Sequence, residues 1–483
     1  MENEILYKLY QTCTGKEPEN ITPLPASGSH RHYFRLTGLS SLIGVQGESA
    51  DENRAFLYLA RHFREKGLPV PQVIGSTADH MYYLQEDLGK ESLFDAIGHG
   101  RTQGEFSAEE QALLHRTFAL LPDFQWKGAE GLDFSQCYPQ AAFNERCILW
   151  DLNYFKYCFL KACGVDFQED RLEDDFQRMT QVLLADADEN TFMYRDFQSR
   201  NIMIRNGQPW FIDFQGGRRG PVYYDVASFL WQAKANYPEN LRNALLQTYL
   251  TSLRRYRSVD EQAFLQRLRH FVLFRMLQVL GAYGFRGYFE RKAHFLQSIP
   301  FAIGNLEQLL RTPLPEYPYL NEILSALVEK RRSQQSLQPA TPPCSGLTVD
   351  ITSFSYRKGI PEDLSGNGGG FVFDCRAIHN PGRYEAYKAL TGMDEPVIRF
   401  LEEDGEILTF LQHVYALADA SVSRYLKRGF THLCISFGCA GGQHRSVYAA
   451  QRLAEHLHQT FGVRIILTHR EQNKALVWKE AQQ

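Results

Sequence analysis

Long apolar runs are missing from this sequence, and so is a leader of the secretory type. Among its 483 residues, no stretch offers the roughly 20 uncharged apolar residues that a membrane-spanning helix needs. The most apolar helical stretch, residues 270–285, is interrupted by Arg275. The opening Met-Glu-Asn-Glu carries neither the positive charge nor the apolar run of a secretory signal. We therefore expect a cytoplasmic protein with no membrane partner.

Paired cysteines and an excess of charge are missing as well. The nine cysteines are scattered without a CxxC pair, so the sequence gives no support for a zinc site and favours reduced cytosolic thiols. The 52 Lys and Arg against 56 Asp and Glu leave a net charge of −4, which excludes a general polyanion binder. The 44% hydrophobic content excludes wholesale disorder.

Length and composition predict several domains. At roughly 150 residues per domain, the chain has room for about three. Residues 328–346 run from charged to polar to proline-rich, so we expect a linker there. Residues 1–89 carry short strand-like runs, residues 90–327 are mostly helical in pattern, and residues 347–483 alternate strand with helix. These patterns predict a two-lobed α+β enzyme with a cleft, linked to a smaller α/β domain.

A hairpin in the helical part brings three polar residues together. Residues 202–213 read as two strands around Asn206-Gly207, a preferred pair for a type I′ turn. Asp196 and Asn201 precede the hairpin and Asp213 ends it, so the returning strands place Asp213 beside Asn201. Their oxygens suit Mg²⁺ carrying ATP phosphates, and one carboxylate remains to accept a hydroxyl proton. The alternative is that these residues only cap turns of a surface hairpin.

The surrounding segments resemble the aminoglycoside phosphotransferase and choline kinase family, whose loop reads H-x-D-x-x-x-x-N before an I-D-F/W segment. They are most similar to the bacterial cell-wall sugar kinases of the AmgK type, which phosphorylate N-acetylmuramate or N-acetylglucosamine at the anomeric hydroxyl. The resemblance implies a protein-kinase-like fold, ATP and Mg²⁺ as cofactors, and an amino sugar as the substrate. The matching segments are residues 29–35, 67–72, 84–89, 194–201, 212–216 and 224–230.

Carried over residue by residue, this resemblance makes Asp196 the catalytic base and makes Asn201 and Asp213 the ligands of Mg²⁺. Asp225 would brace the catalytic loop. The other implied residues are Ser29, His30 and Arg31 over the phosphates, Glu86 and Leu88 at the adenine hinge, and Gln215 and Arg218 facing the sugar.

Three features depart from the family pattern. Tyr194 replaces the usual histidine of the loop, which we interpret as a packing exchange. Residues 41–46 contain no lysine, where most kinases place the one that binds the α- and β-phosphates. Glu52 therefore lacks its ordinary partner and is expected to be a solvated carboxylate at a helix start, or else linked to the metal. The missing lysine also leaves open a kinase-like domain without activity.

A second polar loop lies in the C-terminal part. A strand-like run ends at Phe437, a glycine-rich loop follows, and an amphipathic helix begins near Arg445; such an arrangement binds anions through backbone N–H groups. The spacing Cys439-x5-Arg445-Ser446 also matches cysteine phosphatases. Because Gly438 stands where those enzymes have histidine and no general acid is identifiable, we favour a phosphate receptor. Phosphatase chemistry and a plain tight turn stay as alternatives.

Residues 347–475 resemble the C-terminal domain of the RapZ family, most clearly over residues 438–448. That domain binds glucosamine-6-phosphate and, in enterobacteria, small regulatory RNAs. Gly382 departs from the family's histidine, which leaves the sugar specificity open. The resemblance implies a phosphosugar pocket formed by Cys439, Gly441, Gly442, His444 and Arg445 and lined by Asp374, Arg376 and Asn380.

Two partners follow from these resemblances, an amino sugar substrate and a phosphosugar effector. RNA is a weaker expectation, because residues 347–483 hold 15 Lys and Arg against 15 Asp and Glu and lack a basic footprint. The leading hypothesis is an ATP-dependent amino-sugar kinase joined to a phosphosugar-sensing domain. One alternative is a nucleotide-binding regulator that acts on RNA or a protein partner without turnover. Another is a kinase for a non-sugar alcohol, such as an aminoglycoside or choline, which acidic side chains in the acceptor pocket would favour.

Overall fold

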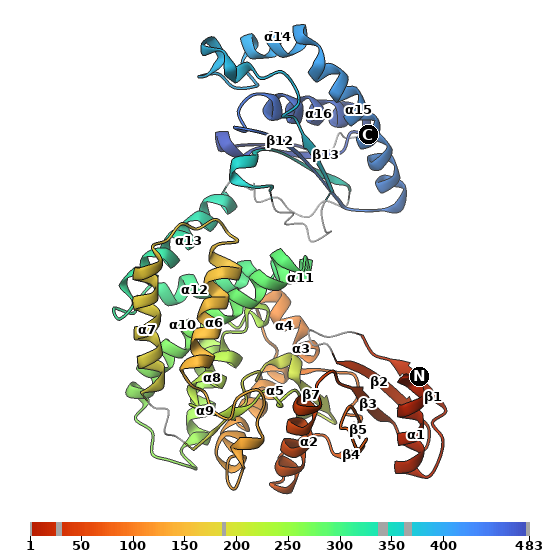
Figure 1. Cartoon of the computed structure of the whole chain (residues 1–483), viewed down its shortest axis with the longest axis vertical. Coiled ribbons are helices and arrows are strands. Elements are labelled where there is room, and N and C mark those ends of the chain that lie inside the picture. The colour runs from red at the N-terminus through yellow and green to blue at the C-terminus, as the bar shows by residue number, and fades with distance from the viewer. Residues whose placement is uncertain (1, 26–30, 186–189, 337–345, 362–369, 480–483) are drawn as a thin grey trace. The chain divides into compact units, whose positions relative to one another are not determined.

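The chain divides into two compact units, each with its own fold (Figure 1). The structure is a computed structural model that describes residues 2–25, 31–185, 190–336, 346–361 and 370–479. Within these ranges, no helix combines the length and the apolar character needed to cross a membrane. The first unit comprises residues 1–161, 167–285 and 298–323, and the second comprises residues 162–166, 286–297 and 324–483.

A five-stranded antiparallel sheet forms the small lobe of the first unit. Helix α1 (Glu2–Thr14) buries Leu6 and Tyr10 against Leu36 and Leu84 of this sheet. Burial of these side chains gives the lobe a small core of its own. The strand order is β1 (Asn20–Pro23), β2 (His32–Thr37), β3 (Leu42–Gln46), β5 (Tyr82–Glu86) and β4 (Val73–Ser76).

Helix α2 (Ala50–Glu65) joins the small lobe to the large one. Its N-cap Ser49 accepts the N–H of Glu52 at 3.3 Å, which satisfies one of the unpaired donors at the helix start. Phe56 on its buried face stacks on Tyr83 of β5 at 4.9 Å and on Phe214 of the large lobe at 5.2 Å between ring centroids. This aromatic column couples the small-lobe sheet to the segment that follows the predicted hairpin.

The large lobe is mainly helical, as the sequence predicts. Its central helix α10 (Glu261–Gly284) packs against α6 (Glu145–Phe155) and α8 (Tyr223–Leu230). A Cβ at Gly281 would lie 2.7 Å from the backbone nitrogen of Phe155, so this close approach requires glycine. The other helices of the lobe are α3 (Leu93–Ala96), α4 (Gly98–Gln103), α5 (Ala108–Phe118), α7 (Glu169–Leu184), α9 (Glu239–Leu253) and α12 (Ile299–Leu310).

The predicted hairpin is confirmed as β7 (Ile202–Arg205) and β8 (Gln208–Phe211). Asn206 and Gly207 have φ of 51° and 69°, and a type I′ turn requires positive values at both positions. A second, short antiparallel strand pair is formed by β6 (Phe192–Met193), which precedes the hairpin in the sequence, and β9 (Arg218–Arg219), which follows it. The residues between β6 and β9 are therefore fixed at both ends.

The first part of the linker predicted from composition, residues 328–336, is helical. Residues 328–336 form the end of helix α13 (Pro318–Ser336), and residues 337–345 lie outside the described residues. Leu324, Leu327 and Val328 are at most 6% exposed and recur at the spacing of a helix face. The helix continues through these residues because apolar side chains recur at helical spacing, although the overall composition of the stretch is that of a linker.

The C-terminal domain is a layered α/β domain with a mixed sheet. Strands β11 (Gly370–Asp374), β12 (His432–Cys439), β10 (Thr348–Ser355) and β13 (Arg464–His469) are parallel and lie side by side in that order. The sequence analysis missed β14 (Lys474–Trp478), an antiparallel edge strand that follows β13 through a short turn. The core is formed by the strands together with α14 (Glu395–Asp404), α15 (Glu406–Arg428) and α16 (Arg445–Phe461).

Residues 395–428 form two helices rather than one continuous helix. Gly405, with φ of 79°, ends α14 and precedes α15. Such a left-handed conformation is a common helix stop and favours glycine. The apolar periodicity continues through this position, which is why pattern alone did not reveal the break.

Candidate active site and anion-binding loop

One buried carboxylate holds the loop before the hairpin. Arg195 has φ of 76°, a conformation that is costly for a residue with a side chain. Asp225 on α8 is 0% exposed, and its two oxygens accept the N–H groups of Tyr194 and Arg195, each at 2.8 Å. The two charge-assisted hydrogen bonds stabilise the strained loop. The bracing role predicted for Asp225 is therefore confirmed.

Tyr194 holds the same loop in place through its buried side chain. Its ring is buried and lies 6.2 Å from the ring of Phe214 and 5.4 Å from that of Phe197. Its hydroxyl donates to the carbonyl of Ile212 at 2.6 Å, directly before Asp213. The exchange of histidine for tyrosine therefore preserves packing, as predicted, and also links the loop to the end of β8 by a hydrogen bond.

The three residues predicted to converge do so. Asn201 Nδ2 donates to Asp213 Oδ2 at 3.0 Å and to the carbonyl of Asp196 at 2.9 Å. The side chain of Asp196 is 44% exposed, so it is open to a bound molecule. A carboxylate, an amide and a second carboxylate thus stand at the end of the hairpin, where hard oxygen ligands can surround a cation.

The electrostatics of Asp213 fit a divalent cation. Burial raises the pKa of its carboxyl group, and the charge of Asp196 raises it further, whereas the hydrogen bond from Gln215 and the charge of Arg31 act in the opposite direction. Two carboxylates that repel each other in a partly buried site are stabilised by a bound cation. The donor set of Asn201 and Asp213 is therefore suited to Mg²⁺.

Glu52 is not the solvated carboxylate that the sequence analysis expected. The Nη2 of Arg31 lies 3.1 Å from Oε1 of Glu52, and the Arg31 side chain is only 4% exposed. Arg31 directly precedes β2, and its neighbour His32 pairs with Gln46 at the end of the lysine-free strand β3. Sequence spacing could not reveal this pair, because the family pattern places the cation within β3 and Arg31 lies before β2. Ser29 and His30, predicted beside Arg31, lie outside the described residues.

Gln215 and Arg218, predicted to face the sugar, point into the protein. Gln215 is 7% exposed and its Nε2 donates to Asp213 Oδ1 at 2.8 Å. Arg218 is 2% exposed and donates to the carbonyl of Gly216 and to the sulfur of Cys147. These contacts fix the segment after Asp213 and do not favour direct sugar contact.

The predicted adenine hinge follows β5. The N–H of Glu86 donates to the carbonyl of Gln72 at 2.8 Å, and its carboxylate pairs with Arg205. Leu88 is 6% exposed just beyond the strand. Because the N–H of Glu86 is already used, a backbone donor for adenine would have to come from Leu88.

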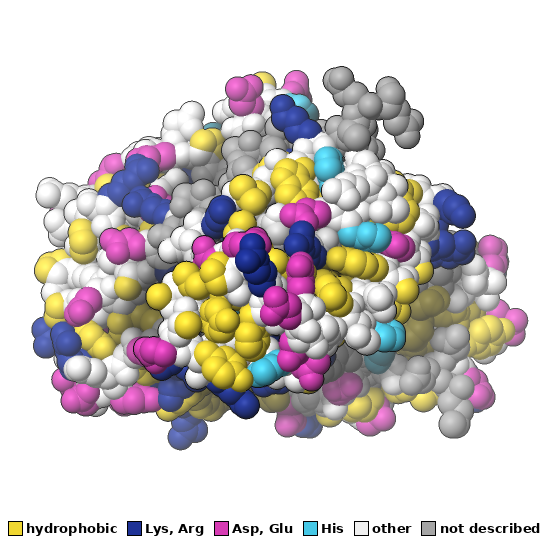
Figure 2. Space-filling model, turned by 90° about the horizontal axis from the view of Figure 1, so that it is seen from above, with side chains coloured by type: hydrophobic (Ala, Val, Ile, Leu, Met, Phe, Trp, Pro, Cys, Tyr) yellow, Lys and Arg dark blue, Asp and Glu magenta, His cyan; other side chains and the backbone are white. Residues whose placement is uncertain are grey.

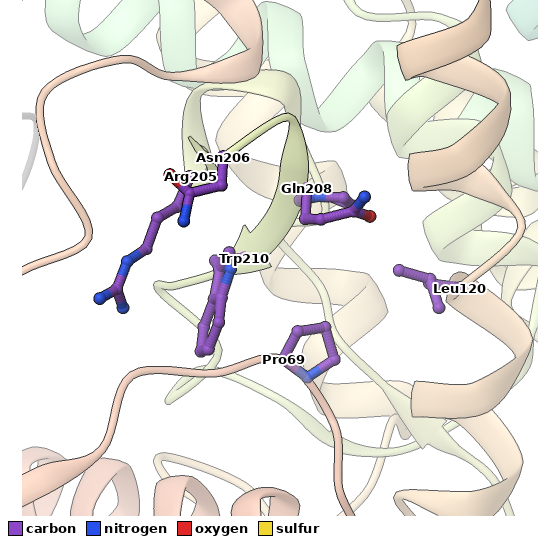
Figure 3. Close-up of a pocket in the computed structure, with 7 residues that line it drawn as sticks. Pro69, Leu120, Arg205, Asn206, Gln208 and Trp210 are labelled. Atoms are coloured by element: carbon purple, nitrogen blue, oxygen red, sulfur yellow. The ribbon is translucent and has the colours of Figure 1, made fainter.

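A pocket of about 450 Å³ lies on the hairpin (Figure 3). Trp210 stands at its centre between Arg205 and Pro69, and Leu120 closes the far side. None of the predicted catalytic, metal or nucleotide residues lines it. We therefore do not assign the substrate to this pocket.

Cys439 ends β12 at the carboxyl edge of the parallel strands, the edge where ligands bind in open α/β sheets. Its Sγ accepts the N–H of Gly442 at 3.2 Å and lies 3.2 Å from Ser446 Oγ. Burial alone would raise the pKa of the Cys439 thiol, but the hydrogen bonds from Ser446, the charge of Arg445 and the Gly442 N–H together lower it. The loop therefore stabilises negative charge at its centre.

The other predicted pocket residues gather around this loop, with one difference. His444 is 7% exposed, and Gly441 and Gly442 lie in the turn itself. Arg445 is 4% exposed, and its Nη1 donates to the carbonyls of Arg376 and Ile378 at 2.9 and 2.6 Å. The Nη1 edge of its guanidinium thus binds backbone rather than lying free for an anion, while its Nε has no hydrogen-bond partner among the described residues.

Asp374, Arg376 and Asn380 lie on the segment that Arg445 holds. Asp374 and Arg376 form an exposed ion pair at 2.7 Å. Asn380 accepts the N–H of Gly382 at 3.2 Å, and a Cβ at Gly382 would meet Asn380 and His444 at 3.3 Å. A side chain at residue 382 would therefore press on the loop residue His444.

Three potential metal ligands meet elsewhere in this domain, although no CxxC motif marks them. Donor atoms of Asp350, His432 and Cys434 lie within 4.8 Å of one another. His432 Nε2 and Asp350 Oδ2 are 2.6 Å apart, which is a hydrogen bond across β10 and β12. Motif spacing along the chain could not find this group because Asp350 comes from a separate strand.

Replacing Asp225 by asparagine should destabilise the first unit. One amide oxygen cannot accept both N–H groups, so we expect Asp225→Asn to cost about 1–3 kcal/mol and to lower the melting temperature in calorimetry. Asp170→Asn, at an exposed position on α7, is the control and should leave the transition in place. An unchanged transition in Asp225→Asn would contradict the bracing role.

The thiol of Cys439 should ionise at lower pH than an ordinary cysteine. We expect alkylation of the Cys439 peptide by iodoacetamide, followed by mass spectrometry, to rise with pH through an inflection below that of free cysteine. Ser446→Ala removes the hydroxyl hydrogen bond and should move the inflection upward. An inflection at or above that of free cysteine in the unaltered protein would rule out the charge-stabilising loop.

Known protein families match both parts of the chain. The family described as phosphotransferase enzyme family matches residues 20–261, half of the chain, and the family described as RapZ C-terminal domain matches residues 347–473. A nucleotide-binding protein of Magnetococcus marinus is 38% identical over 129 residues, which are 27% of this chain and 40% of that protein. A nucleotide-binding protein of Staphylococcus epidermidis is 37% identical over 124 residues, 26% of this chain and 39% of its own length. The chain thus spans about two fifths of the curated relatives it matches.

Solved structures resemble this chain at low identity. A putative aminoglycoside phosphotransferase of Ralstonia eutropha is 12% identical, with a TM-score of 0.46, over 65% of this chain and 99% of that one. An amicoumacin kinase in complex with AMP-PNP, Ca²⁺ and amicoumacin is 16% identical, with a TM-score of 0.42, over 71% of this chain and 95% of that one.

The matched residues 20–261 include the loop of residues 194–201, its brace Asp225 and the Arg31–Glu52 pair, and residues 347–473 include the glycine-rich loop after Cys439. The chain therefore belongs to the phosphotransferase enzyme family and carries, C-terminal to the phosphotransferase domain in the sequence, a RapZ C-terminal domain.

Proposed function

We propose that the first unit transfers the γ-phosphoryl group of ATP to a hydroxyl of an amino sugar of cell-wall metabolism, N-acetylmuramate or N-acetylglucosamine, at the anomeric position. The observation that carries the transfer itself is the convergence of Asp196, Asn201 and Asp213 on a loop held by Asp225. Active phosphotransfer sites need positioned groups more than covalent chemistry, and this loop is rigidly positioned.

Each residue has a distinct task in this proposal. Asp196 accepts the proton of the sugar hydroxyl as its oxygen attacks the γ-phosphorus, and ADP leaves from the opposite side. Asn201 and Asp213 hold Mg²⁺, which supplies positive charge to the β- and γ-phosphates when bound. Leu88 receives the adenine at the hinge. No covalent intermediate with the protein is needed.

Arg31 replaces the absent lysine in our proposal. It is buried, pairs with Glu52 on α2, and its charge lowers the pKa of Asp213, so it lies close to the proposed metal site. A guanidinium suits phosphate oxygens because its N–H groups form a planar fork. This pair supports an active kinase over a domain that only binds nucleotide.

The C-terminal domain supports the amino-sugar assignment and adds a sensor. In its loop the N–H of Gly442 and the hydroxyl of Ser446 lie against the sulfur of Cys439 just before the start of α16, an arrangement that stabilises negative charge. We propose that it binds a phosphosugar as effector and thereby couples kinase output to amino-sugar levels. A cysteine phosphatase is disfavoured, because Arg445 Nη1 bonds to backbone carbonyls.

RNA remains the weaker proposal for this domain. On the face shown in Figure 2, the drawn Lys and Arg side chains alternate with Asp and Glu, and hydrophobic patches lie between them. A sequence-independent RNA contact would need a tract of positive charge. The alternative to a kinase is a regulatory protein that binds nucleotide without phosphorylating an acceptor.

Asp196→Asn should abolish phosphotransfer while leaving nucleotide binding intact. Loss of a general base typically costs roughly 10²- to 10⁴-fold in rate. We expect that loss in ADP release with N-acetylmuramate or N-acetylglucosamine as the acceptor, and unchanged ATP affinity by calorimetry. Binding of ATP by both proteins, with no acceptor-dependent ADP release by the unaltered one, would favour the regulator.

Arg31→Met should lower kcat/KM for ATP by about tenfold or more, because a positive charge at the phosphates is lost. Arg31→Lys should recover part of this loss, since a lysine retains the charge without the fork. Arg61→Met, at an exposed position on α2, serves as the matched control. Equal kinetics of Arg31→Met and the control would remove Arg31 from the site.

A further inference from the structure

Three polar side chains of the C-terminal domain share one face of its sheet. Strands β10 and β12 are parallel neighbours, and Asp350 of β10 lies opposite Cys434 of β12 in the register. His432 stands two residues before Cys434, and residues two apart on a strand point to the same face. Val349 and Leu433, which alternate with them, are at most 3% exposed and belong to the core. The three polar groups therefore lie on the face away from that core, on two rigid strands.

Their donor atoms are close enough to surround one ion. One ligand atom from each residue lies within 4.8 Å of the other two, and His432 Nε2 lies 2.6 Å from Asp350 Oδ2. A nitrogen and an oxygen bound tetrahedrally at about 2.0 Å from zinc lie roughly 3.3 Å apart, and a sulfur at about 2.3 Å lies slightly farther. Shifts on the order of 1 Å at the ends of these side chains therefore bring all three donors to coordinating distance.

The carboxylate of Asp350 has an oxygen that no protein group uses. Its Oδ1 is buried and has no hydrogen-bond partner among the described residues, whereas Oδ2 is bonded to His432. Within those residues, His432 is also the only ion-pair partner of Asp350. A buried carboxylate oxygen without a donor is costly, and a bound cation would remove that cost.

The kinds of ligand atom indicate which cations fit. Thiolate, imidazole and carboxylate together suit Zn²⁺ and related transition metals, whereas Mg²⁺ and Ca²⁺ prefer oxygen ligands alone. The side chains of His432 and Asp350 are 24% and 32% exposed, so an ion can reach them from solvent. A site with three protein ligands leaves a fourth tetrahedral position for water or another small ligand.

We propose that Asp350, His432 and Cys434 form a binding site for a divalent transition-metal ion, with Zn²⁺ as the best fit. The thiol of Cys434 releases its proton to solvent on binding, and the ion replaces the hydrogen bond between His432 and Asp350. The site is distinct from the anion-binding loop, because Cys439 comes five positions after Cys434 in β12, roughly 16 Å at about 3.3 Å per residue. The ion ties the start of β12 to β10, whether or not the first unit is a kinase.

The first test is metal binding by the full-length protein. The protein is stripped with a chelator and titrated with Zn²⁺ in calorimetry, with excess Mg²⁺ present to compete for oxygen-only sites such as Asn201 and Asp213. We expect one Zn²⁺ per chain. Titration with Co²⁺ should give the visible absorption of a tetrahedral ion and the near-ultraviolet charge-transfer band of a cobalt–thiolate bond. Failure to bind Zn²⁺, or a Co²⁺ spectrum without the thiolate band, would overturn the inference.

Variants then assign the bound ion to these residues. Cys434→Ser and His432→Gln should each weaken Zn²⁺ binding at least about tenfold, since the loss even of a group that only orients a ligand costs that much. Cys434→Ser should also remove the thiolate band. The matched controls are Cys158→Ser, at a cysteine of similar exposure in the first unit, and His413→Gln, at an exposed position on α15. Both controls should bind Zn²⁺ as the unaltered protein does.

The position of the metal can also be contradicted directly. A thiolate band that persists in Cys434→Ser and disappears in Cys439→Ser would place the ion at the anion-binding loop and overturn the assignment. Zn²⁺ should raise the melting temperature of the unaltered protein, because a ligand that binds only the folded state stabilises it. The same rise in His432→Gln, which the melting curve itself shows to be folded, would place the ion elsewhere.

Discussion

The buried carboxylate of Asp225 is the contact on which the rest of the first unit depends. It holds the N–H groups of Tyr194 and Arg195 in a conformation that Arg195 would not adopt alone. That conformation directs Asp196 toward the solvent and leaves Asn201 against Asp213. The hydroxyl of Tyr194 then ties the loop to the end of β8. These contacts fix where the polar groups of the loop lie and do not make them more reactive. Correct placement of such groups is the main requirement of phosphoryl transfer.

The charged groups on the small-lobe side of this loop are a second constraint. Toward the small lobe, Asp213 and Glu52 meet Arg31, a combination that suits a cation and phosphates together. The missing lysine of β3 had left the activity of the domain in question. In our proposal Arg31, which directly precedes β2 and pairs with Glu52, supplies the buried cation that β3 lacks.

What the sequence could predict depended on how far apart the partners lie in the chain. Asp196, Asn201 and Asp213 fall within 18 residues around an Asn-Gly turn, and local turn chemistry was enough to bring them together. Arg31 and Glu52 come from separate elements, so only tertiary packing reveals their contact. Gln215 and Arg218 were predicted at the acceptor from the resemblance, yet their side chains are held by Asp213 and Cys147. In the C-terminal domain the loop around Cys439 was recognisable from its glycines, whereas the turn of Arg445 toward the carbonyls of residues 376 and 378 was not.

The central claim is that this chain makes a phosphosugar from ATP. The most direct test is ³¹P NMR of the purified protein with ATP, Mg²⁺ and N-acetylmuramate. The account predicts a new resonance of a sugar-1-phosphate that grows in step with ADP. ATP that binds but stays unchanged, with no new resonance for N-acetylmuramate, N-acetylglucosamine or any other amino sugar, would contradict it.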